Sequence, residues 1–152
     1  MKKIKSYAGY INLKPINGVI YPSSIQNILM KEYISNSLNG KFYLSPTEVL
    51  QAKHSITLNT LISNEVKVNG IVMLSTFSLP NIYEERKDLY KKCLKKKKEV
   101  HFILDEIILL RKNDIEKIEN QLIFRNNFFT KTKVKLSRNE NQIFKHFKTS
   151  FV

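Results

Sequence analysis

Hydrophobic and polar residues follow one another along the chain in segments that predict strands and helices in turn. Residues 7–13 are rich in aromatic and β-branched side chains and predict a first strand, and residues 41–45 predict a short second strand. Residues 70–77 form a nearly continuous apolar run, which is typical of a central strand covered on both faces. Residues 99–104 predict a fourth strand and residues 107–110 a short fifth strand.

Segments with helical spacing of apolar residues lie between these strands. The first helix has Ser23 or Ser24 as its N-cap, and its apolar residues cover so broad an arc that we expect much of it to be buried. Residues 56–66 predict a second helix, and Pro80 opens a third. Residues 113–116 have the pattern of a capping box and predict the start of the last helix.

This alternation of strands and helices predicts an α/β fold. Helical connections favour a mostly parallel sheet of four to five strands with helices on both faces, a three-layer architecture of the resolvase-like or flavodoxin-like kind. At 152 residues the chain is long enough for one domain with one core, which we place at residues 1–129. Residues 130–152 form a basic C-terminal extension, in which Phe144, Phe147 and Phe151 suggest a short helix.

The formal net charge of +13 first suggests a protein that binds nucleic acid or a membrane surface. The 26 basic residues divide into 22 Lys and 4 Arg, however, and proteins that read a nucleic-acid sequence rely on the planar Arg side chain. Six of the lysines lie between residues 91 and 98, where they suit the dipole of the third helix. The composition therefore favours a solvated lysine surface over specific nucleic-acid binding. It leaves open a homo-oligomer, and docking of the basic extension on a protein partner or on the inner membrane.

A single cysteine, Cys93, excludes an internal disulfide and suits a reducing compartment. No apolar run reaches the roughly 18 residues that a membrane-spanning helix needs. Residues 1–5 are basic enough to begin a signal peptide, but Asn12 and Lys14 interrupt the apolar stretch that follows. We therefore predict a cytoplasmic protein.

The candidate site follows from the fold, because ligands of open α/β sheets bind beyond the carboxyl ends of the strands. The polar residues expected at this edge are Lys14, Ser23, Ser24, Gln26, Asn27, Glu48, Ser75, Asp105 and Glu106. Lys14 and the start of the first helix could hold a phosphate. The three carboxylates could supply acid–base chemistry or hold a divalent cation such as Mg²⁺, and Ser75 and Gln26 could orient hydroxyls. Each residue also has a structural alternative, as a helix cap, a backbone partner or a solvated turn.

His101 alternates with apolar neighbours inside the fourth predicted strand, which fits a core histidine as well as a catalytic one. The three His residues and the single Cys lack the spacing of a zinc site, and the chain has no glycine-rich phosphate loop. With four glycines it also lacks a dinucleotide fingerprint. We therefore expect no organic cofactor, and the sequence leaves open whether the protein is an enzyme.

Several blocks stand out in order along residues 7–110. They are Gly9-Tyr10-Ile11, residues 25–33, residues 43–48, residues 70–80, and Val100-His101-Phe102 followed by Asp105-Glu106. Together they resemble the sporadic carbohydrate cluster protein family, whose members are encoded within clusters for bacterial surface polysaccharides such as O-antigen. The resemblance implies a cytoplasmic role in making or modifying a surface glycan. On the matching positions it points to Gln26, Asn27, Glu48, Ser75, His101 and Glu106.

A weaker likeness, at the level of the fold, is to the catalytic domain of serine recombinases. The Arg residues that those enzymes use on the scissile phosphate are missing around residues 75–80, so this likeness implies a shared fold and not a shared reaction. We predict a protein of O-antigen-type polysaccharide biosynthesis that binds a sugar phosphate or nucleotide sugar at the carboxyl edge of the sheet. The alternatives are a non-enzymatic scaffold or binding protein of the same pathway, and a recombinase-fold nucleic-acid binder without cleavage activity.

Overall fold

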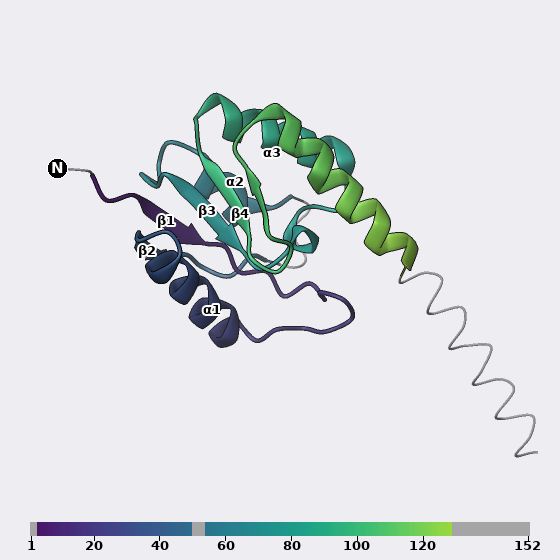
Figure 1. Ribbon diagram of the computed structural model, residues 1–152, viewed down its shortest axis with the longest axis horizontal. Helices are drawn as coiled ribbons and strands as arrows, with labels where there is room; N and C mark the ends of the chain where they lie inside the picture. The colour runs from purple at the N-terminus through teal and green to yellow at the C-terminus, as the bar shows by residue number, and fades with distance from the viewer. Residues whose placement is uncertain (1–2, 50–53, 129–152) are drawn as a thin grey trace, which may run out of the picture. The chain divides into compact units, whose positions relative to one another are not determined.

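Five short strands form one sheet in the computed structural model, which describes residues 3–49 and 54–128 (Figure 1). The strands are β1 (Ser6–Gly9), β2 (Lys41–Leu44), β3 (Gly70–Met73), β4 (Glu99–Phe102) and β5 (Ile107–Leu109). Their order in the sheet is β2-β1-β3-β4-β5, with β1 to β4 parallel and β5 antiparallel to β4. The predicted α/β fold with a mostly parallel sheet is therefore confirmed.

Helices cover both faces of this sheet. The connections contain α1 (Ser23–Asn36), α2 (Ile56–Ile62), the 3₁₀ turn η1 (Thr76–Ser78) and α3 (Tyr83–Lys95). The chain moves outward from β1 to β2 and then back past β1 to β3, so right-handed crossovers place α1 on one face and α2 and α3 on the other (Figure 1). A further helix spans residues 112–128. The chain divides into two compact units, the first ending at Ile118 and the second beginning at Glu119.

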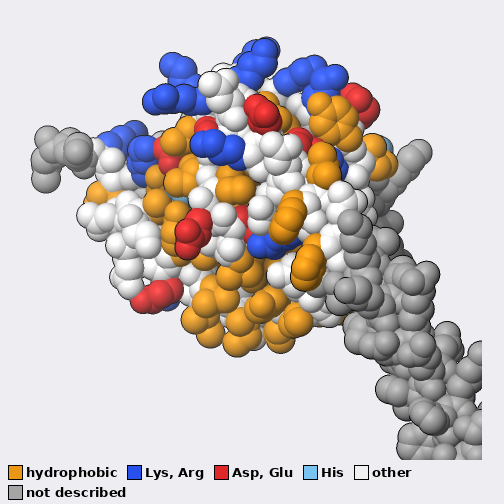
Figure 2. All heavy atoms as spheres, turned by 45° about the vertical axis from the view of Figure 1, so that its right-hand side comes forward, with side chains coloured by type: hydrophobic (Ala, Val, Ile, Leu, Met, Phe, Trp, Pro, Cys, Tyr) orange, Lys and Arg blue, Asp and Glu red, His pale blue; other side chains and the backbone are white. Residues whose placement is uncertain are grey.

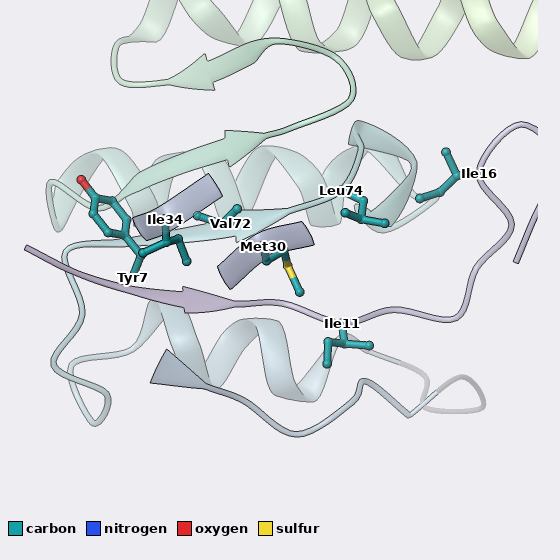
Figure 3. Close-up of a cluster of buried hydrophobic side chains, with 7 residues drawn as sticks. All are labelled: Tyr7, Ile11, Ile16, Met30, Ile34, Val72 and Leu74. Atoms are coloured by element: carbon teal, nitrogen blue, oxygen red, sulfur yellow. The ribbon is translucent and has the colours of Figure 1, made fainter. Parts of the chain in front are cut away.

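The core residues of the strands point alternately to the two faces of the sheet. Tyr7 and Val72 point to the α1 face, where they pack with Met30 and Ile34 of the helix (Figure 3). Successive side chains of a strand face opposite sides, so the neighbouring Ala8 and Ile71, both fully buried, face α2 and α3. The continuous apolar run predicted for the third strand follows from this arrangement, because β3 lies at the centre of the sheet and is covered twice.

Several predicted helix starts are wrong by a few residues. Pro22 occupies the N-cap position of α1 with no side-chain cap, so neither Ser23 nor Ser24 caps it. The third helix begins at Tyr83 rather than at Pro80, because the backbone of its N-cap, Ile82, is still extended. The last helix begins at residue 112, one residue before the expected capping box, and Asp114 of its first turn accepts hydrogen bonds from the N–H groups of Leu110 and Arg111.

The expectation that α1 is buried over a broad arc is also wrong. The helix buries Gln26, Met30 and Ile34, whereas Ile28 is 62% exposed and its neighbours Ile25 and Leu29 are exposed as well. On the face drawn in Figure 2, hydrophobic side chains gather at the lower edge, where α1 and the loop before it lie in Figure 1. A helix on a sheet covers it with one stripe only, and the described residues provide no second layer over the outer side of α1.

The described part of the chain contains no helix that is both long and apolar enough to cross a bilayer. The predicted basic extension, residues 130–152, lies outside the described residues, together with its three phenylalanines.

Lys98 is buried and not part of a solvated lysine surface. Its ammonium donates to the carbonyls of Leu61 and Ser63 at 2.7 Å and of Val66 at 3.0 Å, at the C-terminal end of α2. Burial lowers the pKa of Lys98, and the neighbouring Lys96 lowers it further. The side chain thus satisfies a carbonyl of the last turn of α2 and two carbonyls of the segment that follows it.

Replacing Lys98 by methionine is expected to lower the free energy of unfolding by about 1–3 kcal/mol, because buried carbonyls lose their donors. Urea denaturation of the variant measures this loss, with the exposed Lys96→Met as a control that removes the same charge. Equal stabilities of the two variants would show that the carbonyl contacts of Lys98 contribute nothing.

Candidate functional site

A polar hollow opens at the carboxyl edge of the sheet, between the loops that follow β1 and β3. The strand order reverses between these two strands, and such switch points are where open α/β sheets bind their ligands. The hollow has a volume of about 270 Å³. Its polar lining includes Asn12, Lys14, Glu48, His54, Ser55, Asn81 and Glu85. Two of the predicted site residues, Lys14 and Glu48, therefore lie at one site.

Lys14 is the most strongly positioned cation of this hollow. Its Nζ donates to the carbonyl of Leu79 at 2.8 Å and to Oδ1 of Asn81 at 3.2 Å, both in the segment between η1 and α3. Burial lowers the pKa of Lys14. A half-buried ammonium fixed on two oxygens keeps one further N–H for a ligand, since an ammonium has three.

Asn12 fixes the loop that carries Lys14. Its side-chain N–H groups reach Oη of Tyr10 at 3.2 Å and the carbonyl of Ser78 at 3.3 Å, and its Oδ1 accepts from the backbone N–H of Lys14 at 2.9 Å. Asn12 is almost fully buried, so this network joins the end of β1 to the turn after β3. It holds both walls of the hollow in place.

Glu48 is buried, and its carboxylate accepts four hydrogen bonds. Oε1 accepts from the N–H groups of Val49 at 3.2 Å and Thr57 at 3.1 Å. Oε2 accepts from the N–H of Leu58 and from Oη of Tyr10, both at 3.1 Å. The carboxylate thus caps the N-terminus of α2 and forms the floor of the hollow. Burial, with the adjacent carboxylate second, raises the pKa of Tyr10.

His54 and Glu85 form a pair that the sequence analysis did not find. Nδ1 of His54 lies 3.1 Å from Oε1 of Glu85, and the imidazole is 67% exposed at the mouth of the hollow. The two residues are 31 positions apart, and no spacing rule connects a histidine before α2 with an acid in the first turn of α3. The pair provides a histidine oriented by a carboxylate, the usual arrangement of a proton acceptor.

The structure does not bring the three predicted carboxylates together. Asp105 and Glu106 lie in the turn between β4 and β5, two strands from β1, and neighbouring strands are about 4.8 Å apart. Glu106 is exposed, with a φ of 53°, and does not line the hollow. Among the described residues no group of three or more His, Cys, Asp or Glu side chains could hold a metal ion.

Ser75 is fully buried and bonded to Asp105. Its Oγ donates to Oδ2 of Asp105 at 3.0 Å, and the N–H of Thr76 donates to the same oxygen at 2.6 Å. Ser75 also accepts from the N–H of Phe77 and so caps η1. These contacts tie the turn after β3 to the turn after β4, below the surface of the site.

The residues predicted at the start of α1 also lie outside the lining of the hollow. Gln26 is buried and donates to the carbonyls of Asn12 at 2.9 Å and Tyr21 at 2.8 Å, so it braces the loop between β1 and α1. Oδ1 of Asn27 is buried without a hydrogen-bond partner in the described part of the chain. Ser23 and Ser24 stand in the first turn of α1.

His101 lies inside β4, on the α1 face of the sheet, in a network of its own. Its Nε2 is 3.0 Å from Oε2 of Glu99, and its Nδ1 is 3.1 Å from Oη of Tyr33. Tyr7 donates to Glu99 at 3.1 Å, and Lys5 bonds the other carboxylate oxygen. Burial lowers the pKa of His101 and outweighs the nearby carboxylate, which favours the neutral ring. A neutral ring that donates from Nε2 to Glu99 and accepts at Nδ1 from Tyr33 satisfies both contacts. This network ties α1 to β1 and β4 and has no contact with the hollow.

The charge state of His101 predicts that stability falls in mild acid. Because its pKa in the folded protein lies below 6.5, the unfolded chain takes up this proton first as the pH falls. The contribution of His101 to the free energy of unfolding is complete above pH 6.5. It is lost as the pH falls through the pKa that His101 has in the folded protein. Glu99, whose burial is outweighed by hydrogen bonds from Lys5, His101 and Tyr7, also has a lowered pKa, but its effect begins only below 4.5.

Urea denaturation at about pH 7.5 and about pH 5.5 measures this loss. His101→Gln should show a smaller difference between the two pH values than the unchanged protein. His54→Gln, which removes an exposed imidazole, should show the full difference. A His101→Gln protein with an undiminished pH dependence would contradict the assignment.

Comparisons with protein-family models, with curated proteins and with solved structures find no match to this chain. The resemblance to the sporadic carbohydrate cluster protein family stays a prediction.

Proposed function

We propose that the hollow binds the phosphate of a sugar phosphate or nucleotide sugar. The observation that carries this proposal is the half-buried Lys14 ammonium, fixed at the switch point of the sheet by Leu79 and Asn81. An ammonium held in this way loses little side-chain entropy on binding and forms a charge-assisted hydrogen bond with a phosphate oxygen.

The rest of the lining suits the sugar. The Asn81 carboxamide, the Ser55 hydroxyl and the Glu85 carboxylate offer donors and acceptors for hydroxyl groups. Glu48 does not compete with the phosphate, because its lone pairs are directed to Tyr10 and to backbone N–H groups. In this proposal Glu48 is a positioning residue, and His54 replaces it as the group suited to proton transfer.

The family resemblance supplies the setting of the proposal. From it we infer a role in the biosynthesis of a bacterial surface polysaccharide of the O-antigen type, in the cytoplasm, where activated sugars are the building blocks. The hollow fits this setting, because its lining is polar and its volume is small enough to select one sugar unit and its phosphate.

Titration of the full chain with glucose 1-phosphate, UDP-glucose, glucose and a short DNA duplex tests the proposal. We expect saturable binding of a phosphorylated sugar that persists at about 0.5 M salt, since partly buried charge pairs are screened less than exposed ones. At about 100 times its dissociation constant such a ligand stabilises the fold by about 2.7 kcal/mol, which a thermal shift detects. Binding of DNA alone, lost at high salt, would instead reflect the net charge of +13.

A scaffold or binding protein of the same pathway is the second candidate function. The exposed apolar side of α1, with Ile25, Ile28 and Leu29, favours it, because exposed apolar patches of soluble proteins often mark contact surfaces. In this case no phosphorylated sugar binds, and Ile28→Lys changes the association state of the protein in light scattering. A monomer that binds glucose 1-phosphate and is unaffected by Ile28→Lys would exclude the scaffold.

A further inference from the structure

The Lys14 hollow continues into a second hollow of about 260 Å³. The two share His54, Ser55, Pro80 and Glu85 in their linings, so they are adjoining parts of one groove. The groove passes from the strand ends to the space beside α2 and α3. The His54–Glu85 pair lies where the two hollows meet.

The second hollow differs from the first in its chemistry. Its own lining adds Asn59 of α2 and Asp88, Leu89 and Lys92 of α3. Nζ of Lys92 is directed to Oδ1 of Asn59 at 3.3 Å, and both side chains reach the surface. Among the described residues, its lining contains no half-buried ammonium comparable to that of Lys14, since Lys92 is exposed. The second hollow is therefore less suited to bind a phosphate than the first one.

An uncharged sugar suits this lining better. The Asp88 carboxylate and the Asn59 carboxamide can pair with neighbouring hydroxyls of a sugar ring. Pro80 and Leu89 are buried apolar residues that give the hollow a floor for the C–H face of the ring. Apolar walls with a few convergent polar groups are typical of sites for small molecules.

We propose that the second hollow binds an uncharged sugar residue, so that the groove holds two sugar units. The phosphorylated unit lies against Lys14 and the uncharged unit against Asp88, with the His54–Glu85 pair between them. This inference rests on the proposed function, because it assigns the neighbouring hollow to the phosphate. It narrows the ligand class to a phosphorylated sugar together with a saccharide, either linked or as two separate molecules.

Titration of the ¹⁵N-labelled full chain, followed by NMR, tests the inference with glucose 1-phosphate and with maltose as an uncharged disaccharide. We expect maltose to shift the amide signals of Asn59, Asp88 and Leu89, and glucose 1-phosphate to shift those of Lys14 and Asn81. Asp88→Asn should weaken maltose binding about five- to tenfold, because one acceptor becomes a donor and the charge is lost. The same variant should leave the affinity for glucose 1-phosphate within about twofold.

Glu84→Gln is the matched control, since it removes one carboxylate from the exposed side of the same helix without touching the groove. Binding of glucose 1-phosphate without any binding of maltose, or maltose binding that Asp88→Asn and Glu84→Gln affect equally, would overturn the inference and leave the proposed function standing. Failure of glucose 1-phosphate and of UDP-glucose to bind would overturn the proposed function itself. Asp88 is exposed, so its variant should retain the signal dispersion of a folded protein.

Discussion

Glu48→Gln is expected to lower the free energy of unfolding by about 2–4 kcal/mol, because a glutamine amide turns one acceptor into a donor that faces buried N–H groups. The carboxylate accepts from Val49, Thr57, Leu58 and Tyr10, so no rotation of the amide satisfies all four donors. Since α2 is only seven residues long, it depends on this cap more than a long helix would. A loss of this size lowers the melting temperature by roughly 10 °C in a domain of this length.

Urea denaturation and a thermal melt measure the effect, with Glu65→Gln as the control on an exposed residue. The control should stay within about 0.5 kcal/mol of the unchanged protein. Equal stability of the two variants would show that Glu48 is not needed as a cap. Its carboxylate would then be available for the acid–base role that the sequence alone suggested.

The order and type of the elements could be predicted from the sequence because each segment shows the periodicity of its environment. For the apolar run at residues 70–77, the periodicity predicts the strand but not the residue at which it ends. Gly70–Met73 is the central strand as predicted, but the chain then turns into η1, where Ser75 caps the turn. Leu74, directly after the strand, is also fully buried, so the apolar pattern continues after the strand has ended.

The candidate site was predictable as far as the fold determines it. The switch-point rule placed Lys14 and Glu48 at the same edge, and both line the hollow. The rule does not say how deeply a side chain is buried or where along the edge it lies. It therefore could not show that Ser75 and Gln26 are buried or that Glu106 lies in a turn two strands away. The His54–Glu85 pair depends on how α2 packs beside α3, a tertiary contact that leaves no local signal in the sequence.

The buried polar residues around the hollow explain why sequence reasoning assigned chemistry to side chains that support structure. Gln26 bonds a backbone carbonyl of the loop after β1, Asn12 bonds one of η1, and Glu48 accepts from backbone N–H groups of the first turn of α2. These groups would otherwise be buried without partners. Polar residues at strand ends therefore divide into those that hold the loops and those that reach the ligand. In the proposed function, Lys14 and His54 belong to the second group.

Lys14→Met is expected to weaken binding of glucose 1-phosphate about 10- to 100-fold, because a charge-assisted hydrogen bond contributes about 1.5–3 kcal/mol. Methionine keeps the length of the side chain but removes every donor, so the wall of the hollow is preserved. The effect should appear as a raised dissociation constant in calorimetric titration, with little change in the affinity for an uncharged sugar. Stability should change less than for Glu48→Gln, because the ammonium leaves only one carbonyl and one carboxamide oxygen behind.

Lys41→Met is the matched control for this prediction, since it removes one positive charge from the exposed edge strand β2, outside the lining of the hollow. If binding came from the overall charge of +13, both variants would lose the same small part of it, and added salt would remove the rest. If the hollow is the site, Lys14→Met alone loses affinity, and the difference between the two variants persists at high salt because Lys14 is half-buried. Equal affinities of the two variants would therefore contradict the assignment of the phosphate to Lys14, whatever else the protein binds.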